Sequence, residues 1–280
     1  MKDVNLSKRM EAVVSMVSPQ SFTIADVGCD HAYVSIALIN RKLATKVIAM
    51  DVGTGPLNIA RTNITEAGYG DIIDIRLGDG LEKLKPGEAD GIIIAGMGGL
   101  LIKGILERGA DILSYETKRP VLILQPQSDI KEIRMFLHKM AYHIVAEKML
   151  VEDGKYYTII KAEPNDCEMD NIGADEEAKG SLECLEAYTE EDYVYGKCNL
   201  ENQSGVLLEY LQKERTVLKQ IFNKVEASIT QSKKKGESIP NSTSVRLESV
   251  RQELEINARA LQLYDTCIDR KLEGGLHREM

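Results

Sequence analysis

The sequence lacks any apolar run close to the roughly 18 residues that a membrane-spanning helix needs. Its first residues, MKDVNLSKRMEAVV, also lack the apolar core of a signal peptide. The five cysteines form no CxxC pair and match no spacing of zinc ligands. We therefore expect a cytoplasmic protein with reduced thiols, no membrane partner and no metal site.

A strongly basic balance is also missing, since the formal net charge is −9. The acidic excess is uneven along the chain. Residues 1–163 hold 20 Lys and Arg against 21 Asp and Glu, whereas the remaining residues hold 15 against 23. Net charge describes solubility and repulsion rather than the potential of one cleft. A local basic face is therefore compatible with the first part of the chain.

Short apolar segments alternate with helical periodicity through residues 1–163. This pattern predicts a parallel sheet covered by helices on both faces. A closing hairpin around Asp153-Gly154 is expected to add antiparallel edge strands. One continuous helix is expected over LLIKGILERGADIL, and a later helix is expected to begin with Ser128 as its N-cap.

The rest of the chain divides into a linker and a helical region. Residues 164–200 are expected to be an acidic linker or insertion, because 163–192 contain twelve acidic residues and one lysine. Residues 201–280 carry two heptad stretches separated by a helix-breaking segment with Gly and Pro. An antiparallel coiled-coil hairpin is predicted, with Asn257 setting its register; pairing between two chains is the alternative. The fold class is α/β, a Rossmann-like sheet followed by this α-helical hairpin.

The first predicted strand ends in ADVGCDHAYVSIAL, a nucleotide-binding kind of turn that lacks the second and third glycines of the dinucleotide pattern. Gly28 permits a tight turn into the helix. Asp30 and Tyr33 stand where the other glycines would be. A carboxylate at a helix start repels a pyrophosphate, so the turn favours a cationic or phosphate-free ligand. The alternative is that Asp30 only caps the helix.

The turns after the next strands add a consistent pattern. Asp51 follows the second strand at a spacing that suits a carboxylate binding ribose hydroxyls. Asp79, flanked by glycines, suits a purine amino group, and Gly96 leaves the backbone open beside the pliable side chain of Met97. Each residue taken singly also fits an ordinary turn. Together they indicate a ligand with a ribose and an adenine but no phosphate, as in a class I S-adenosylmethionine methyltransferase.

The order of several strings carries a resemblance to a known family. LSKRMEAVVSMV, ADVGCDHAYVSIAL, GPLNIA, RLGDGL, IAGMGG, LILQP and EDGKYYTII resemble the bacterial tRNA adenine-N1 methyltransferases that act at position 22. The resemblance covers residues 1–163, and that family also has a C-terminal coiled-coil domain. It implies a class I methyltransferase sheet, S-adenosyl-L-methionine as cofactor and tRNA as partner. We expect a monomer or weak dimer.

The resemblance also implies roles for particular residues. To the cofactor it assigns Asp26, Gly28, Cys29, Asp51, Val52, Asp79, Gly80, Gly96 and Met97. As catalytic residues at the target base it places Asp30, His31 and Tyr33. On the substrate side it places Arg9, close to the mouth of the cleft. Two further substrate-side candidates come from the residues themselves: Gln127, which follows the fifth strand and is otherwise a surface loop residue, and Lys8, which could contact a phosphate.

Methylation at adenine N1 needs orientation more than proton transfer, because an in-plane lone pair attacks the methyl carbon directly. Asp30 is expected to accept a hydrogen bond from the adenine N6 amino group and to stabilise the growing positive charge. Further candidates for phosphate contacts are Lys131, Arg134 and the tip lysines 233–235. The less functional alternatives are a core position for Tyr33, a backbone bond for His31 and a solvated turn for the tip lysines.

Two other functions remain compatible with the sequence. One is a methyltransferase of the same fold that acts on a small molecule or a protein. The other is a non-catalytic RNA-binding protein in which the hairpin is the working part.

Overall fold

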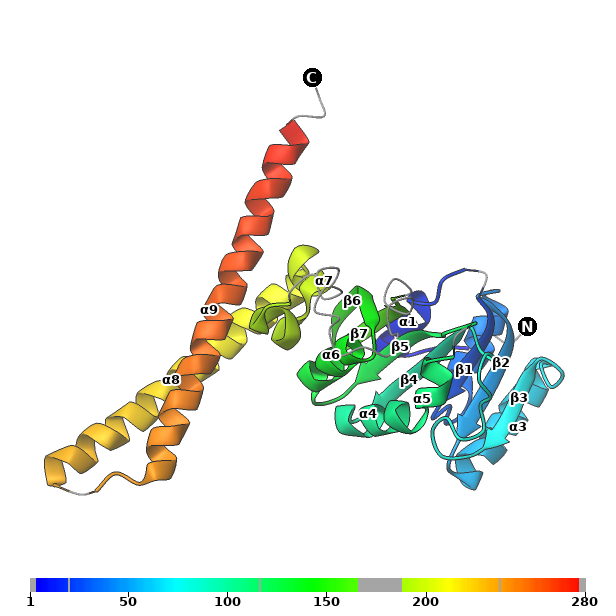
Figure 1. The fold of residues 1–280 in the computed structure, drawn as a ribbon, viewed down its shortest axis with the longest axis horizontal. Coiled ribbons are helices and arrows are strands. Elements are labelled where there is room, and N and C mark those ends of the chain that lie inside the picture. The colour runs from blue at the N-terminus through cyan, green and yellow to red at the C-terminus, as the bar shows by residue number, and fades with distance from the viewer. Residues whose placement is uncertain (1–3, 20, 116, 166–187, 237, 277–280) are drawn as a thin grey trace, which may run out of the picture. The chain divides into compact units, whose positions relative to one another are not determined.

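The computed structural model describes residues 4–19, 21–115, 117–165, 188–236 and 238–276. The chain divides into two compact units, Met1–Glu186 and Ala187–Met280 (Figure 1). Within the described ranges no helix is long and apolar enough to cross a membrane. The predicted linker centre, 166–187, lies outside these ranges, while residues 192–201 form helices of the second unit.

The first unit is built on a seven-stranded sheet of order β3-β2-β1-β4-β5-β7-β6. The strands are β1 (Ser21–Val27), β2 (Ala44–Asp51), β3 (Ile73–Leu77), β4 (Gly91–Met97), β5 (Val121–Pro126), β6 (Tyr142–Glu152) and β7 (Lys155–Pro164). β1 to β5 pair in parallel, which confirms the predicted parallel sheet. Their carboxyl ends therefore meet at one edge.

The closing hairpin differs from its prediction in one respect. Its turn residues Asp153 and Gly154 have φ angles of 49° and 72°, as a two-residue hairpin turn requires. However, of the two hairpin strands β6 alone lies at an edge of the sheet, because β7 inserts antiparallel between β5 and β6. Ile159, Ile160 and Ala162 of β7 are fully buried, and burial of this apolar run requires an interior position.

Helices cover both faces of the sheet. α1 (Lys8–Ser15), α2 (Tyr33–Asn40) and α3 (Thr54–Ala67) share a core with one face of the strands, including Ile93 of β4. Ile92 and Ile94 point to the opposite face because side chains alternate along a strand. There α4 (Gly99–Arg108) packs on β4, on α5 (Ala110–Leu113) and on α6 (Ile130–Lys139).

Two expectations about these helices were wrong. The segment expected as one helix is divided at Gly109 into α4 and α5. The N-cap of α6 is Asp129, with a φ of 52° and no side-chain cap bond, rather than Ser128. The Ser128 hydroxyl instead accepts a hydrogen bond from the N–H of Gly99 at 3.3 Å and donates to Asp129 at 2.7 Å.

Arg134, expected at a phosphate, is also placed differently. Its side chain is 1% exposed, and its Nε donates to Glu147 at 2.8 Å. A guanidinium buried and paired in this way cannot contact RNA. The pair instead joins α6 to β6.

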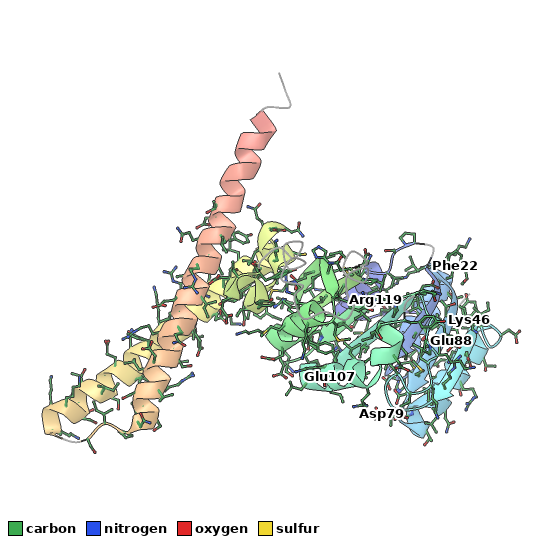
Figure 2. All side chains as sticks on the ribbon, in the orientation of Figure 1. Phe22, Lys46, Asp79, Glu88, Glu107 and Arg119 are labelled. Atoms are coloured by element: carbon green, nitrogen blue, oxygen red, sulfur yellow. The ribbon has the colours of Figure 1, made fainter. Side chains whose placement is uncertain are left out.

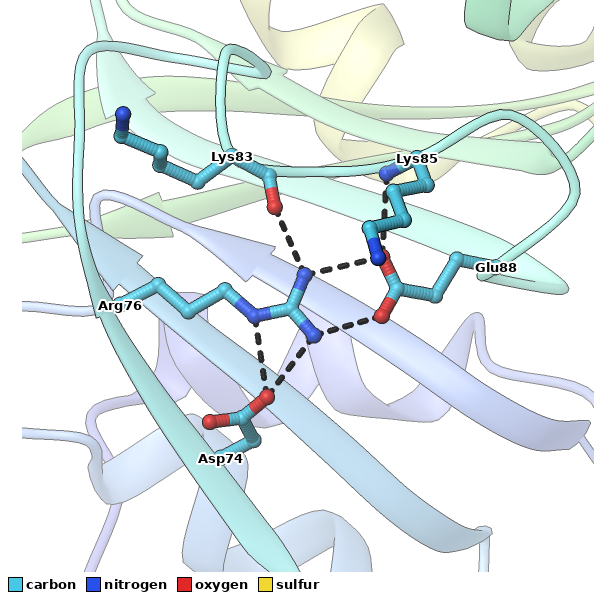
Figure 3. A network of polar contacts seen from close by, with 5 residues as sticks. All are labelled: Asp74, Arg76, Lys83, Lys85 and Glu88. Atoms are coloured by element: carbon cyan, nitrogen blue, oxygen red, sulfur yellow. Dashed lines mark hydrogen bonds and ion pairs between the residues drawn. The ribbon is translucent and has the colours of Figure 1, made fainter.

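A second ion network fastens the segment that follows β3 (Figure 3). The Arg76 guanidinium binds Asp74 at 2.8 Å and both carboxylate oxygens of Glu88 at 2.5 and 2.8 Å, and donates to the carbonyl of Lys83 at 2.7 Å. The N–H of Lys85 donates to Glu88 as well. The loop between β3 and β4, which begins with Gly78-Asp79-Gly80, is therefore tied back to β3.

The second unit is a helical hairpin. η3 (Asp192–Gly196) and α7 (Lys197–Glu201) precede the long helices α8 (Gly205–Lys235) and α9 (Asn241–Leu276). Tyr264 bonds to the carbonyl of Gln203 at 2.9 Å, and Asn257 to that of Leu211 at 3.1 Å. The two helices thus run antiparallel within one chain, as predicted.

A polar layer interrupts the apolar seam between α8 and α9. Fully buried Asn257 donates to Glu214 at 3.0 Å, and the hydroxyls of Tyr195 and Tyr210 donate to the same carboxylate at 2.6 and 3.0 Å. Leu211 and Leu218 lie buried on either side. Because the three donors converge on Glu214 in a single alignment of the helices, the layer favours one register of the hairpin.

Candidate active site

A cleft of about 440 Å³ opens where the carboxyl ends of β1, β2, β4 and β5 meet beside α1. Its lining includes residues predicted for cofactor binding, for catalysis and for substrate binding. Its lining consists of Arg9, Met10, Asp26, Gly28, Cys29, Asp30, His31, Tyr33, Val34, Asp51, Ala95, Gly96, Met97 and Gln127.

The turn between β1 and α2 has an unusual backbone. Gly28, Asp30 and Ala32 have φ angles of 73°, 49° and 60°. The φ angle of Gly28 favours glycine, and the end of the flexible Met97 side chain occupies the space beside it, 2.2 Å from where a Cβ would lie. Left-handed backbone at two non-glycine residues is strained, and such strain concentrates at functional sites.

The three predicted catalytic side chains lie together on this turn. His31 Nε2 is 3.4 Å from Asp30 Oδ1, and the rings of His31 and Tyr33 meet edge-to-face with centroids 5.8 Å apart. Tyr33 is 46% exposed, so the alternative of a core position is wrong. Asp30 does not cap α2 either, since the N-cap is Ala32 without a side-chain bond. The turn therefore presents an acid, an imidazole and a phenol to the cleft.

Two more carboxylates lie on the cofactor side of the cleft. Asp51 accepts backbone hydrogen bonds from Asp30 at 3.1 Å and from Gly53 at 2.8 Å. Asp26 is buried and accepts a 2.6 Å hydrogen bond from Ser35. Burial raises the pKa of Asp26 to about 6, against the opposing effect of the Ser35 bond and with a small contribution from the charge of Asp51. Asp26 therefore titrates close to neutral pH and can respond to a cationic ligand.

The cofactor side of the cleft also contains two uncharged groups, the Cys29 thiol and the backbone of Gly96. Burial, followed by the charges of Asp26, Asp51 and Asp30, raises the pKa of the Cys29 thiol far above its usual range. Cys29 therefore remains a neutral thiol that packs rather than reacts. A Cβ at Gly96 would lie 3.6 Å from Arg9 and 3.9 Å from Gln127, so the cleft comes close to the bare backbone at Gly96.

Sequence reasoning missed the residue that holds Arg9. The Arg9 guanidinium donates to Gln125 Oε1 at 2.8 Å and lies 5.0 Å from the ring centroid of Tyr157. The backbone N–H of Arg9 donates to the Glu152 carboxylate at 3.1 Å. Gln125 had a visible signal, because it is a polar residue at the end of the apolar string VLILQ. Met10, Val34 and Ala95 line the cleft without such a signal.

Four predicted residues lie outside the lining of this cleft. Asp79, at the surface (Figure 2), pairs with Arg108 at 3.2 Å beside a separate hollow of about 130 Å³. Gly80 is buried against Ile105, and a Cβ there would lie 2.9 Å from it. Val52 is 72% exposed, and Lys8 is exposed on α1.

The donor set fits a cofactor with hydroxyls and positive charge. Asp26, Asp30 and Asp51 supply carboxylates, and Gly96 supplies close backbone, whereas a pyrophosphate would meet three acids. Among the residues that the structure describes, no group of three His, Cys, Asp or Glu side chains is arranged to hold a metal ion.

The sheet with its antiparallel β7 and the carboxylate after β2 define a methyltransferase domain, and the family model described as "Methyltransferase domain" matches residues 6–160. Over 167 residues the chain is 43% identical to the tRNA (adenine(22)-N(1))-methyltransferase of Bacillus subtilis (strain 168), covering 59% of this chain and 68% of that relative. The chain belongs to the family of this tRNA (adenine(22)-N(1))-methyltransferase.

Solved structures extend the similarity to the helical hairpin. The Bacillus subtilis m1A22 tRNA methyltransferase superposes with a TM-score of 0.73 at 30% identity, over 92% of this chain and 99% of that one. An uncharacterized Listeria monocytogenes protein gives 0.77 at 27%, over 92% and 100%. A Streptococcus pneumoniae protein in complex with S-adenosyl-L-methionine gives 0.71 at 28%, also over 92% and 100%.

Proposed function

We propose that this chain transfers a methyl group from S-adenosyl-L-methionine to N1 of adenine 22 in tRNA. One observation carries the proposal: Asp30, His31 and Tyr33 share a turn with Gly28, and Asp51 holds that turn by a hydrogen bond. Cofactor and target base therefore meet in a single cleft. The curated Bacillus subtilis relative supports this substrate and position.

On the cofactor side, the two acids take different roles. When bound, the cofactor supplies an electrophilic methyl group on a sulfonium centre. Asp51 would bind the ribose hydroxyls with the lone pairs that its two backbone bonds leave. Buried Asp26 would bind a cationic group, and Gly96 and Met97 would bound the adenine side of the cleft. Asp79 would join this set once released from Arg108.

On the substrate side, no general base is required, because N1 attacks with a free lone pair and no proton has to leave it. Asp30 would accept from the N6 amino group and stabilise the charge that develops on the ring. Tyr33 would orient or stack on the base, and His31 would bind its edge or a phosphate. The target base must be unpaired or flipped to reach these groups.

The rest of the tRNA requires contacts to phosphates. Lys8, Arg9 and Lys131 are candidates on the first unit, and Lys233 to Lys235 at the tip of the hairpin are candidates on the second. We propose a catalytic domain over residues 1–163, a linker over 164–200 and a tRNA-binding hairpin over 201–280. The enzyme would act in the cytoplasm as a monomer or weak dimer.

Methyl transfer to bulk tRNA from labelled cofactor, followed by nucleoside analysis, tests the proposal. We expect labelled 1-methyladenosine, and a single tRNA transcript should lose this product when its adenine 22 is replaced by guanine. Cofactor binding without a methylated RNA product would point to a small-molecule or protein methyltransferase. Absence of cofactor binding would leave only an RNA-binding role.

A further inference from the structure

Gln125 is a fully buried polar residue at the end of β5. Two donors converge on one atom of its side chain: the Arg9 Nη1 at 2.8 Å and the N–H of Gly96 at 3.1 Å. That atom must be the amide oxygen, because only oxygen accepts. The amide nitrogen then donates to the carbonyl of Pro126 at 3.0 Å. Both polar atoms of the side chain are bonded, and these partners fix its orientation.

One of those partners is an irregular point in β4. The pairing of β4 with β5 shifts register between Ala95 and Met97, so Gly96 forms a bulge with a φ of 80°. Bulges often aim residues into active sites. The N–H of Gly96 donates to the Gln125 side chain, and this bond holds the bulged backbone where it borders the cleft.

The other partner, Arg9, is held from three directions. Besides the bond to Gln125, its Nε lies 3.7 Å from Glu152, and its guanidinium lies over the ring of Tyr157. An unrestrained arginine loses side-chain entropy when it becomes fixed. Arg9 has already lost this freedom before any ligand binds, yet it still lines the cleft.

We propose that Gln125 is a positioning residue for substrate binding: its amide oxygen couples the Arg9 guanidinium to the Gly96 bulge, so that Arg9 meets an RNA phosphate beside the target adenosine. The inference rests on the proposed function. It predicts that a neutral, buried side chain controls one phosphate contact of the electrostatic part of tRNA binding.

The experiment measures tRNA affinity of the full chain as a function of salt. A protein–phosphate contact contributes about 0.7 to 0.9 to the slope of log affinity against log salt concentration. Gln125→Met keeps the length of the side chain and removes the amide. We expect this variant to lose about one contact from the slope and to bind tRNA roughly tenfold more weakly. Arg9→Met should lose the same amount, and the double variant no more than either single one.

Gln125→Asn is the second variant, because it keeps a buried neutral amide but is one methylene shorter, so that its oxygen no longer reaches Arg9. It should lose the same part of the slope, and it keeps the inference testable if Gln125→Met does not fold. An unchanged slope in folded Gln125→Met or Gln125→Asn, or additive losses in the double variant, would each overturn the inference. Failure of the wild-type chain to methylate tRNA would instead overturn the proposed function.

Discussion

Asp51 Oδ2 accepts a hydrogen bond from the backbone N–H of Asp30 at 3.1 Å. The acid proposed to hold the cofactor therefore also fixes the residue proposed to face the adenine. Asp30 has a φ of 49°, a strained value for a non-glycine residue, and the bond offsets part of that strain. The two proposed roles, cofactor binding and base orientation, are thus joined by one hydrogen bond.

Asp51→Asn should weaken cofactor binding by at least about tenfold, since hydrogen bonds to a charged acceptor contribute roughly 1.5–3 kcal/mol. The variant should also lower kcat, because the Asp30 turn loses a charged anchor. Titration calorimetry and steady-state kinetics measure the two effects. Asp71→Asn, at an exposed acid between α3 and β3, is the control for lost charge. Unchanged cofactor affinity would remove Asp51 from the ribose.

Asp30→Asn should retain cofactor affinity and lose about 100-fold in kcat, roughly the effect of deleting one electrostatic stabiliser of a transition state. Asparagine tolerates left-handed backbone, so this variant removes the charge without disturbing the turn. Asp30→Ala would add strain to the same loss. Single-turnover kinetics with saturating tRNA measures the effect, and turnover near the wild-type rate would exclude the proposed role of Asp30.

Cofactor affinity should fall as the pH falls through about 6, the raised pKa of Asp26. Below that pH the carboxyl is protonated and a cationic group gains nothing from it. Asp26→Asn should bind more weakly and show no such dependence. Affinity measured from pH 5 to 8 tests this, and a flat profile in the wild type would contradict it.

The same group has an opposite effect on the free protein. Because the folded-state pKa of Asp26 is raised from 3.8, its contribution to stability is complete below about pH 3.8 and is lost as the pH rises through about 6. Without cofactor, Asp26→Asn should therefore be at least as stable as the wild type at pH 7. A thermal melt of both proteins compares them.

Glu88→Gln should destabilise the fold by about 1–2 kcal/mol at pH 7 by breaking the bonds to Arg76 (Figure 3). Arg76 lowers the pKa of Glu88 to about 2 from 4.5. The stabilisation is present above pH 4.5 and is lost as the pH falls through about 2. Denaturant unfolding at pH 7, 5 and 3 should show the two proteins converging only in acid. Glu82→Gln, on the same loop but exposed, should behave like wild type.

A chain that ends at residue 165 should fold and bind cofactor normally but bind tRNA at least tenfold more weakly. The buried cluster shared by α1, α2, α3 and the sheet lies entirely within the retained residues. A full-length variant that combines Lys233→Gln, Lys234→Gln and Lys235→Gln removes the charge at the tip but keeps the hairpin. It therefore separates the contribution of the tip charge to tRNA binding from that of the helices. Undiminished tRNA binding by the shortened chain would assign the hairpin to another task.

Periodicity and turn chemistry were enough to predict most of the fold. Alternating strands and helices predicted the parallel sheet, and Asp153-Gly154 predicted the hairpin turn. Glycines and acids at strand ends predicted the cleft, because parallel strands bring their carboxyl ends together. The interior position of β7 depended on burial of its apolar run against β5, which spacing along the chain does not encode.

The missing part of the site consists of contacts between distant segments. Arg9 meets Gln125 and Glu152 across 116 and 143 residues, and no local pattern marks such partners. The left-handed backbone at Asp30 and Ala32 was equally invisible, since neither residue demands it. Ser128 was predicted as an N-cap because its hydroxyl suits that role. In the structure this hydroxyl instead accepts a hydrogen bond from the N–H of Gly99.

The polar layer of Glu214, Asn257 and Tyr195 favours one alignment of the two long helices, so that the hairpin has a defined length. α8 has 31 residues, so at 1.5 Å per residue it is about 46 Å long. A slip of one heptad would move α9 by roughly 10 Å along α8 and take Asn257 away from Glu214. The polar layer therefore holds α9 at one position along α8, and the length of α8 sets the distance of the three tip lysines from the base of the hairpin. A lengthened or shortened α8 would therefore change the reach of the lysines that are proposed to contact phosphates, without altering a single residue of the cleft.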